Sequence, residues 1–150
     1  MTRNRIVLVA LAGSLFASTT GAQSLEGPFR GSLVCGKLQP AAPMLRAPLD
    51  LIIRGSEVIF ARPIFNANGR VIGTEIGSGT LEADGKLHVT ATWEDGGWGF
   101  TGEYGGTLAP AGGALTGTEA WHAPNGTTDM RSCTAALVAA HELKQAEAPK

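Results

Sequence analysis

The sequence is poor in charged, cysteine and aromatic residues. Of its 150 residues 17% are charged, and the net charge is −1 at pH 7. Nothing in this balance gives an electrostatic reason to expect nucleic acid as a partner. Aromatic residues make up 6% of the chain and include three Trp and one Tyr. A chain of this length has room for one ordinary domain.

The sequence also lacks the common catalytic and cofactor motifs. It contains no Walker loop, no Gly-x-Ser-x-Gly, no His-Glu-x-x-His, no Cys-x-x-Cys and no dinucleotide fingerprint after a strand. Its histidines, His88, His122 and His141, have no ligand spacing and are interpreted as solvated residues instead of metal ligands. We therefore expect no cofactor and no metal, and an enzymatic interpretation has little support.

One apolar run stands at the start of the chain. A positive segment, Met1–Arg5, precedes the apolar residues Ile6–Phe16, and small residues lead to Ala22. A membrane span needs about 20 apolar residues, so the run is too short to cross a bilayer. The pattern predicts a signal-peptide helix over 1–22, cleaved after Ala22, and hence an exported protein, periplasmic or extracellular, with no transmembrane segment in its mature chain. No cysteine near the cleavage site could take a lipid.

Export changes the interpretation of the two cysteines, Cys35 and Cys133. Thiols in an oxidising compartment usually pair, which predicts one disulfide. Free thiols, a metal pair and a catalytic cysteine remain as alternatives. Loss of residues 1–22 leaves 10 basic and 13 acidic residues, a mildly acidic balance that indicates no particular partner.

The mature chain reads as a series of β-hairpins. Residues 23–138 hold short runs of alternating apolar residues separated by Gly, Pro, Asn and Asp, with no helical apolar period. Residues 139–150 form a polar tail, either a short helix or disordered. The runs predict a first strand near Pro28–Lys37, a long connection over Arg62–Arg70, and a bulge between Ile76 and Leu81 where the apolar alternation slips.

Turn residues allow the strand registers to be predicted. Gly55-Ser56 sets Arg54 opposite Glu57, and a three-residue loop ending at Gly85 sets Leu81 opposite Leu87. Loops over 94–97 and 110–113 set Trp93 opposite Trp98, Ala91 opposite Phe100, Leu87 opposite Tyr104, Leu108 opposite Leu115, Tyr104 opposite Glu119 and Gly102 opposite Trp121. The last hairpin sets Glu119 opposite Arg131.

Sorted by face, these registers give one apolar surface and one threonine-rich surface, as in a half-solvated antiparallel sheet. Both cysteines fall on the apolar face, so their bridge would join the first strand to the last. The prediction is an all-β domain over 23–138, a closed or nearly closed antiparallel meander barrel of about eight strands. An aligned β-sandwich is the alternative.

The candidate site lies on the core face. Glu119 and Tyr104 share that face, where an unpaired carboxylate is costly. Either Arg131 and the Tyr104 hydroxyl satisfy Glu119, or Glu119 contacts a ligand in the interior. Arg62 could bind an anion at a barrel mouth or be an ordinary rim residue.

Aromatic side chains could line a ligand space next to this site. The tryptophans Trp93, Trp98 and Trp121 either wall such a space or fill gaps in the core. Six glycines leave room on the core face, or else permit the curvature of a small barrel: Gly73, Gly77, Gly79, Gly102, Gly106 and Gly117.

Three functions remain open. The first is a non-catalytic binding module, either a small-ligand carrier or a protein-binding inhibitor barrel that uses loops 39–43 or 62–70. The second is a small periplasmic hydrolase or isomerase with Glu119 as base and Tyr104 as proton donor. The third is a structural envelope accessory protein that contacts another envelope protein.

Overall fold

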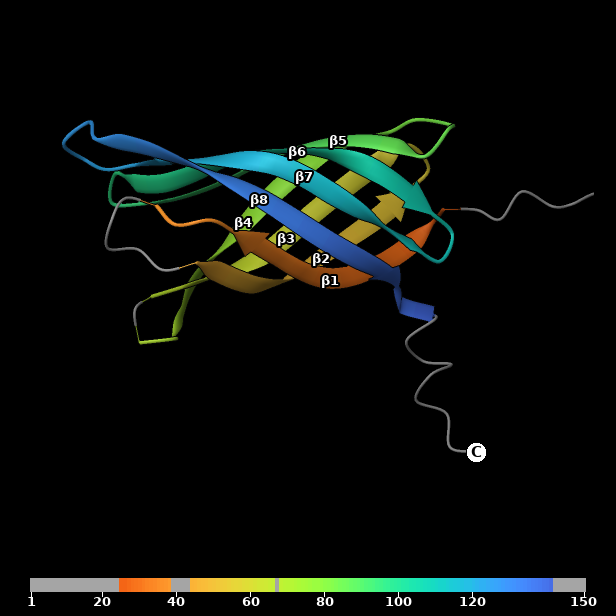
Figure 1. The fold of residues 1–150 in the computed structure, drawn as a ribbon, viewed down its shortest axis with the longest axis horizontal. Coiled ribbons are helices and arrows are strands. Elements are labelled where there is room, and N and C mark those ends of the chain that lie inside the picture. Colours follow the sequence, from red (N-terminus) through yellow and green to blue (C-terminus); the bar gives the residue numbers. More distant parts are fainter. Residues whose placement is uncertain (1–24, 39–43, 67, 142–150) are drawn as a thin grey trace, which may run out of the picture.

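The computed structural model describes residues 25–38, 44–66 and 68–141, and within them the chain forms a closed antiparallel β-barrel (Figure 1). The predicted signal peptide, the loop over 39–43 and residues 142–150 lie outside the described residues. Among those described, no helix is long and apolar enough to cross a membrane. The eight strands follow one another in chain order around the barrel: β1 Gly27–Cys35, β2 Leu45–Arg54, β3 Glu57–Phe65, β4 Val71–Leu81, β5 Lys86–Asp95, β6 Trp98–Ala109, β7 Gly112–His122 and β8 Thr128–Ala139.

The strand connections define two ends of the barrel. The Gly55 end carries the turns 55–56, 82–85 and 110–111, together with the start of β1 and the end of β8. The Gly96 end carries the end of β1 and the start of β2, the end of β3 and the start of β4, and the turns 96–97 and 123–127. This up-and-down order confirms the predicted meander and excludes the sandwich alternative.

The β5–β6 turn is tighter than predicted. Gly96 and Gly97 both have positive φ, 57° and 84°, as a two-residue type I′ hairpin requires. The strands therefore continue to Asp95, which pairs with Trp98, and Trp93 pairs with Phe100. The predicted pairs of Trp93 with Trp98, Ala91 with Phe100 and Leu87 with Tyr104 were wrong by two residues, because they assumed a four-residue loop.

The β6–β7 hairpin differs from its prediction by the same amount. Its turn is the dipeptide at 110–111, so Tyr104 pairs with Gly117 and Gly102 pairs with Glu119. The predicted pairs of Tyr104 with Glu119, Gly102 with Trp121 and Leu108 with Leu115 were wrong. A slip of two residues keeps every side chain on its face. Three other predicted pairs are confirmed: Arg54 with Glu57, Leu81 with Leu87, and Glu119 with Arg131.

The first and last strands close the barrel. β1 pairs with β8 from Phe29 opposite Ala139 to Cys35 opposite Cys133, and the two cysteines form the predicted disulfide. The bridge spans 98 residues of sequence. By the chain-entropy argument a crosslink over a loop of this length stabilises the fold by about 4–5 kcal/mol.

Most of the barrel interior is an apolar core. Leu, Ile, Val and Phe side chains from β1, β2 and β3 meet Leu87, Leu108, Leu115 and Leu137 from the other wall. The threonines of the outer face, such as Thr80, Thr90 and Thr118, are exposed. The predicted division into a core face and a solvated face is therefore correct.

The structure differs from the sequence-based prediction most in β3 and β4. Arg62 lies within β3 and is buried, whereas the sequence placed it at the start of a loop. The inward positions of β4 alternate without a slip through Glu75 to Leu81, and Ile76 lies outside. The irregularity predicted between Ile76 and Leu81 occurs instead in the pairing of β3 with β4, between Ile64 and Phe65.

Candidate functional site

Four charged side chains lie inside the barrel, in its half nearer the Gly96 end. Arg62 of β3, Glu75 of β4, Glu119 of β7 and Arg131 of β8 are 2%, 0%, 0% and 8% exposed. Ionised groups are rarely buried to this degree unless they are paired. We call these four residues the charge cluster.

The charge cluster is a linear chain of ion pairs. The Arg62 Nε donates to Glu75 Oε2, and the Arg62 Nη2 donates to Glu119 Oε1. The Arg131 Nε donates to the other oxygen of the same carboxylate, Glu119 Oε2. Two guanidinium groups thus balance two carboxylates, and Glu119 accepts on both oxygens. The predicted contact between Arg131 and Glu119 is present, and Arg62 is a second partner.

An aromatic ring and the disulfide border the charge cluster. The guanidinium carbons of Arg62 and Arg131 lie 5.8 Å and 5.4 Å from the centroid of the Phe100 ring, within cation–π range. The Cys133 Sγ lies 3.9 Å from Glu119 Oε2. Cys35, Cys133 and Glu119 converge closely enough to resemble a metal site, but both sulfurs are used in the disulfide. They therefore offer no thiolate ligand.

Two buried polar atoms in this region have no hydrogen-bond partner among the described residues: Glu75 Oε1 and Tyr104 Oη. The Tyr104 ring stacks on Phe60 with a centroid distance of 5.0 Å. Burial, with the Glu75 and Glu119 carboxylates adding to it, raises the pKa of Tyr104 far above its ordinary value, so the phenol stays protonated. Burial also raises the pKa of Glu75, although the Arg62 guanidinium opposes this shift.

The predicted partnership of Tyr104 with Glu119 does not form as a hydrogen bond. Both Glu119 oxygens accept from arginines, and the Tyr104 hydroxyl has no hydrogen-bond partner in the described part of the chain. Two guanidinium groups thus occupy the carboxylate that would act as the base, and the phenol, with its raised pKa, is a weak acid. The geometry therefore gives little support to acid–base chemistry by this pair.

Side chains or the backbone of neighbouring strands occupy the space beside the interior glycines. A Cβ at Gly102 would come within 2.5 Å of the Tyr104 hydroxyl, and one at Gly73 would meet the Trp93 indole. At Gly77, Gly79, Gly106 and Gly117 a Cβ would meet backbone carbonyl oxygens of the neighbouring strands. These glycines allow close approach of strands and aromatic rings, as the curvature interpretation predicts, and they do not border open room.

The three tryptophans lie in different surroundings. Trp93 points inward from β5, with its ring centroid 5.7 Å from that of Phe100. Trp98 lies at the Gly96 end and is 48% exposed, and its ring is 5.3 Å from that of Trp121 on β7. Of the predicted site residues, the structure thus places Arg62, Tyr104, Glu119 and Trp93 in the interior and puts Trp98 and Trp121 at an end.

Among the described residues, that end also carries most of the large exposed apolar side chains. Besides Trp98, these side chains are Met44, Phe65, Val71, Ile72 and Met130, each at least 38% exposed. Each of these residues lies within two residues of a strand terminus at the Gly96 end. We call these six residues the apolar rim.

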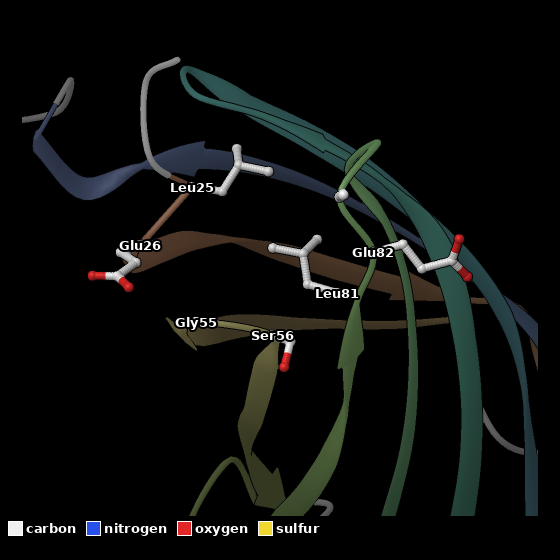
Figure 2. Close-up of a pocket in the computed structure, with 7 residues that line it drawn as sticks. Leu25, Glu26, Gly55, Ser56, Leu81 and Glu82 are labelled. Carbon is white, nitrogen blue, oxygen red and sulfur yellow. The ribbon is translucent and has the colours of Figure 1, made fainter. Parts of the chain in front are cut away.

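An open depression of about 410 Å³ lies at the opposite, Gly55 end. In Figure 2 the Leu25 and Leu81 side chains point toward its middle, whereas the carboxylates of Glu26 and Glu82 point away. Gly55, Ser56 and Ala83 complete its wall. Its polar groups do not converge on one point, so it has little capacity to orient a small polar ligand.

Sequence reasoning missed two members of this site. Glu75 was overlooked because the neighbouring Ile76 was taken as the core residue of that strand. The signal was present, since Glu75 shares parity with the interior positions Gly73, Gly77 and Leu81. Phe100 was assigned a wrong cross-strand partner, and its contact with two arginines follows only from the closed barrel.

The comparisons with known proteins give no family. No protein-family model matches the chain, and no curated protein sequence matches it. The functional argument therefore depends on the geometry of the barrel.

Proposed function

We propose that this protein is an exported, non-catalytic binding module that contacts another protein through the apolar rim at the Gly96 end. The observation that carries the proposal is that six large exposed apolar side chains lie around that end, including Trp98 and Met130 at 48% and 62% exposure. Exposed apolar side chains mark protein interaction sites when they are numerous on one part of a surface, and Trp and Met are enriched at such sites.

The interior supports a protein partner over a small ligand. The charge cluster satisfies most of its own hydrogen bonds, and side chains or strand backbone occupy the space next to the interior glycines. A carrier would need room for its ligand beside these residues. The alternative of a hydrolase or isomerase using Glu119 and Tyr104 has the difficulty that Glu119 is held by two arginines.

The disulfide supports export, because such bridges persist in oxidising compartments, the periplasm or the cell exterior. A binding role also includes the accessory envelope protein considered above, since such a protein acts by contacting another subunit. The two roles differ only in whether the partner is inhibited.

Photo-crosslinking in the native host tests the proposal. A benzophenone amino acid at Met130 in the apolar rim should crosslink one defined partner, and mass spectrometry of the product would identify it. The matched control places the same group at Thr118, an exposed position on the barrel wall. Equal crosslinking from Met130 and Thr118, or none from Met130, would contradict a contact surface at this end.

A further inference from the structure

An inward-facing row of aromatic side chains lies next to the Gly96 end. Trp93 of β5 pairs with Phe100 of β6, which pairs in turn with Trp121 of β7, so the three side chains are neighbours on the interior face. Inward side chains nearer the Gly55 end, such as Leu87 and Leu115, are buried, whereas these three are half-buried. Solvent therefore reaches the interior of the barrel as far as these rings. We call Trp93, Phe100 and Trp121 the aromatic row.

The Arg131 guanidinium group reaches this row with donors that are not used. Arg131 lies one pair deeper, opposite Glu119, but its guanidinium carbon is 5.4 Å from the centroid of the Phe100 ring. Its Nε donates to Glu119, whereas its Nη1 and Nη2 have no hydrogen-bond partner among the described residues. The fully enclosed polar atoms that lack a partner in that part of the chain are Glu75 Oε1 and Tyr104 Oη, so the two Arg131 nitrogens are reached by solvent. The side chain as a whole is only 6% exposed.

The chemistry of these groups fits a carboxylate. Two free nitrogens on one edge of a guanidinium group bind a planar carboxylate through two parallel hydrogen bonds. Arg62 adds a second positive charge, with its guanidinium carbon 5.8 Å from the centroid of the Phe100 ring. The aromatic row supplies apolar surface beside the Arg131 edge, and small-molecule sites combine such walls with a few convergent polar groups. The occupant that fits is therefore a carboxylate carried on an apolar or aromatic group.

The charge balance of the interior supports a bound anion. The two arginines and two carboxylates of the charge cluster cancel only while Glu75 is ionised. Burial raises the pKa of Glu75, although Arg62 opposes the shift. A protonated Glu75 leaves two guanidinium groups with one carboxylate, and the charge of one anion would complete the balance. The other titratable groups that act on Glu75 are Glu119, Arg131 and the Tyr104 phenol, which stays protonated.

We propose that the mouth of the barrel at the Gly96 end binds a small organic carboxylate, held by the Nη1 and Nη2 edge of Arg131 beside the aromatic row. This inference goes beyond the contact proposed for the apolar rim, because it uses inward-facing side chains and a small molecule. The ligand would lie at the open mouth, so it needs no enclosed cavity deeper in the barrel.

The first test titrates the oxidised protein with benzoate, followed by calorimetry and by NMR of the tryptophan indole N–H groups. Benzoate should bind saturably, one to one, and should shift the Trp93 and Trp121 signals. Benzamide is the matched ligand, with the same ring and no charge, and should bind about tenfold more weakly. Equal binding of the two ligands, no saturation by about 10 mM benzoate, or binding that leaves both indole signals unchanged would overturn the proposal.

A pair of variants on β8 gives the second test. Arg131→Lys keeps a positive charge beside Glu119 and removes the two-nitrogen edge, so the affinity for benzoate should fall about tenfold. Ser132→Ala, at the next and outward-facing residue, should bind as the parent does. Equal affinities of the two variants would overturn the proposal. Should Arg131→Lys fail to fold, the indole signals of the parent protein still decide it.

A carboxylate of the chain near the site gives the third test. Asp129 shares the inward face of β8 with Arg131, two residues nearer the mouth, and accepts from the Met130 N–H. Its negative charge opposes a second carboxylate nearby, so Asp129→Asn should raise the affinity for benzoate severalfold. A lower affinity in this variant would place benzoate elsewhere and overturn the proposal.

The pH dependence of binding gives the last test. Benzoate affinity should fall as the pH rises from about 5 to about 8, since loss of the Glu75 proton removes the net positive charge of the charge cluster. Glu75→Gln mimics the protonated carboxyl and should bind at the higher pH as tightly as the parent binds at the lower one. A parent affinity that stays constant or rises with pH would overturn the proposal.

Discussion

Arg62 on β3 donates to Glu119 on β7, so this ion pair joins two strands that stand four places apart in a ring of eight. The bond therefore crosses the barrel instead of following its wall. Through Glu75 and Arg131 it extends to the neighbouring strands β4 and β8. The charge cluster ties the β3–β4 hairpin to the opposite wall, next to the disulfide.

Replacing Glu119 by Gln should lower the free energy of unfolding by about 3–5 kcal/mol, because removing one partner leaves buried charge without compensation. Urea denaturation of the oxidised protein measures this. Thr118→Ala, at the next residue on the outer face, should change it by less than about 0.5 kcal/mol. A loss for Glu119→Gln as small as that of the control would contradict a structural role for the cluster.

Breaking the disulfide should lower the free energy of unfolding by about 4–5 kcal/mol, since it frees a loop of nearly 100 residues in the unfolded chain. The double variant Cys35→Ser, Cys133→Ser and the reduced parent protein should agree in denaturation midpoint. A reduced protein as stable as the oxidised one would show that strand pairing alone closes the barrel.

Neighbouring glycines on β6 should respond differently to alanine. A Cβ at Gly106 would overlap the Ala114 carbonyl oxygen, whereas at Gly105 the nearest atom is the Leu87 oxygen at 3.7 Å. Gly106→Ala should therefore cost about 1–3 kcal/mol of stability through overpacking. Gly105→Ala should be neutral, or stabilise by up to about 1 kcal/mol through the unfolded state. Equal effects would mean that the interior has spare room.

Stability should depend on pH through Glu75. Burial raises the pKa of this carboxyl above 4.5, so between 4.5 and its folded value the native state binds more protons than the unfolded one. The contribution of Glu75 is then full below pH 4.5 and is lost as the pH rises through the folded value. Against a Glu75→Gln variant, the parent should lose stability more steeply above pH 4.5. Parallel unfolding free energies from pH 4.5 to 7.5 would contradict this.

Removing the Tyr104 hydroxyl should not destabilise the protein. Its oxygen is buried without a hydrogen-bond partner among the described residues, so Tyr104→Phe removes a desolvation cost and keeps the ring on Phe60. We expect the unfolding free energy to stay equal or to rise by about 1 kcal/mol. A clear loss of stability in thermal denaturation would show that the hydroxyl has a partner in solution.

The alternation of apolar residues was sufficient to predict the strands and their buried faces, because it is a local pattern. The closure of the barrel was predicted from the two cysteines in the first and last strands. The register between neighbouring strands was harder to predict. The Gly96-Gly97 turn was read as part of a longer loop, and a slip of two residues leaves the apolar pattern unchanged, so the pattern could not reveal the error. The pairing of Glu119 with Arg131 could be predicted because one hairpin contains both residues.

Contacts across the barrel interior could not be predicted from the sequence in the same way. Arg62 meets Glu119 only because β3 and β7 face each other in a closed ring, and no local pattern carries that information. The β2–β3 ladder ends after Asp50 and Ala61, where the register places Pro48 opposite Pro63 and neither residue has an N–H to donate. This end of the ladder could be predicted only once the β2–β3 turn was known. The inward position of Glu75 could have been predicted from the alternation of β4, in which it follows the same period as Gly77 and Leu81.

The ring of strands has one seam unlike the others. Seven ladders join strands consecutive in the chain, so each needs only a hairpin, whereas the β1–β8 ladder unites the two extremities of the domain. Before this seam forms, two long edges stand open to pairing with other molecules. A covalent link between Cys35 and Cys133 holds the seam shut at one end. The oxidised protein is thereby guarded against aggregation through its outermost strands, and a reducing environment would remove that guard.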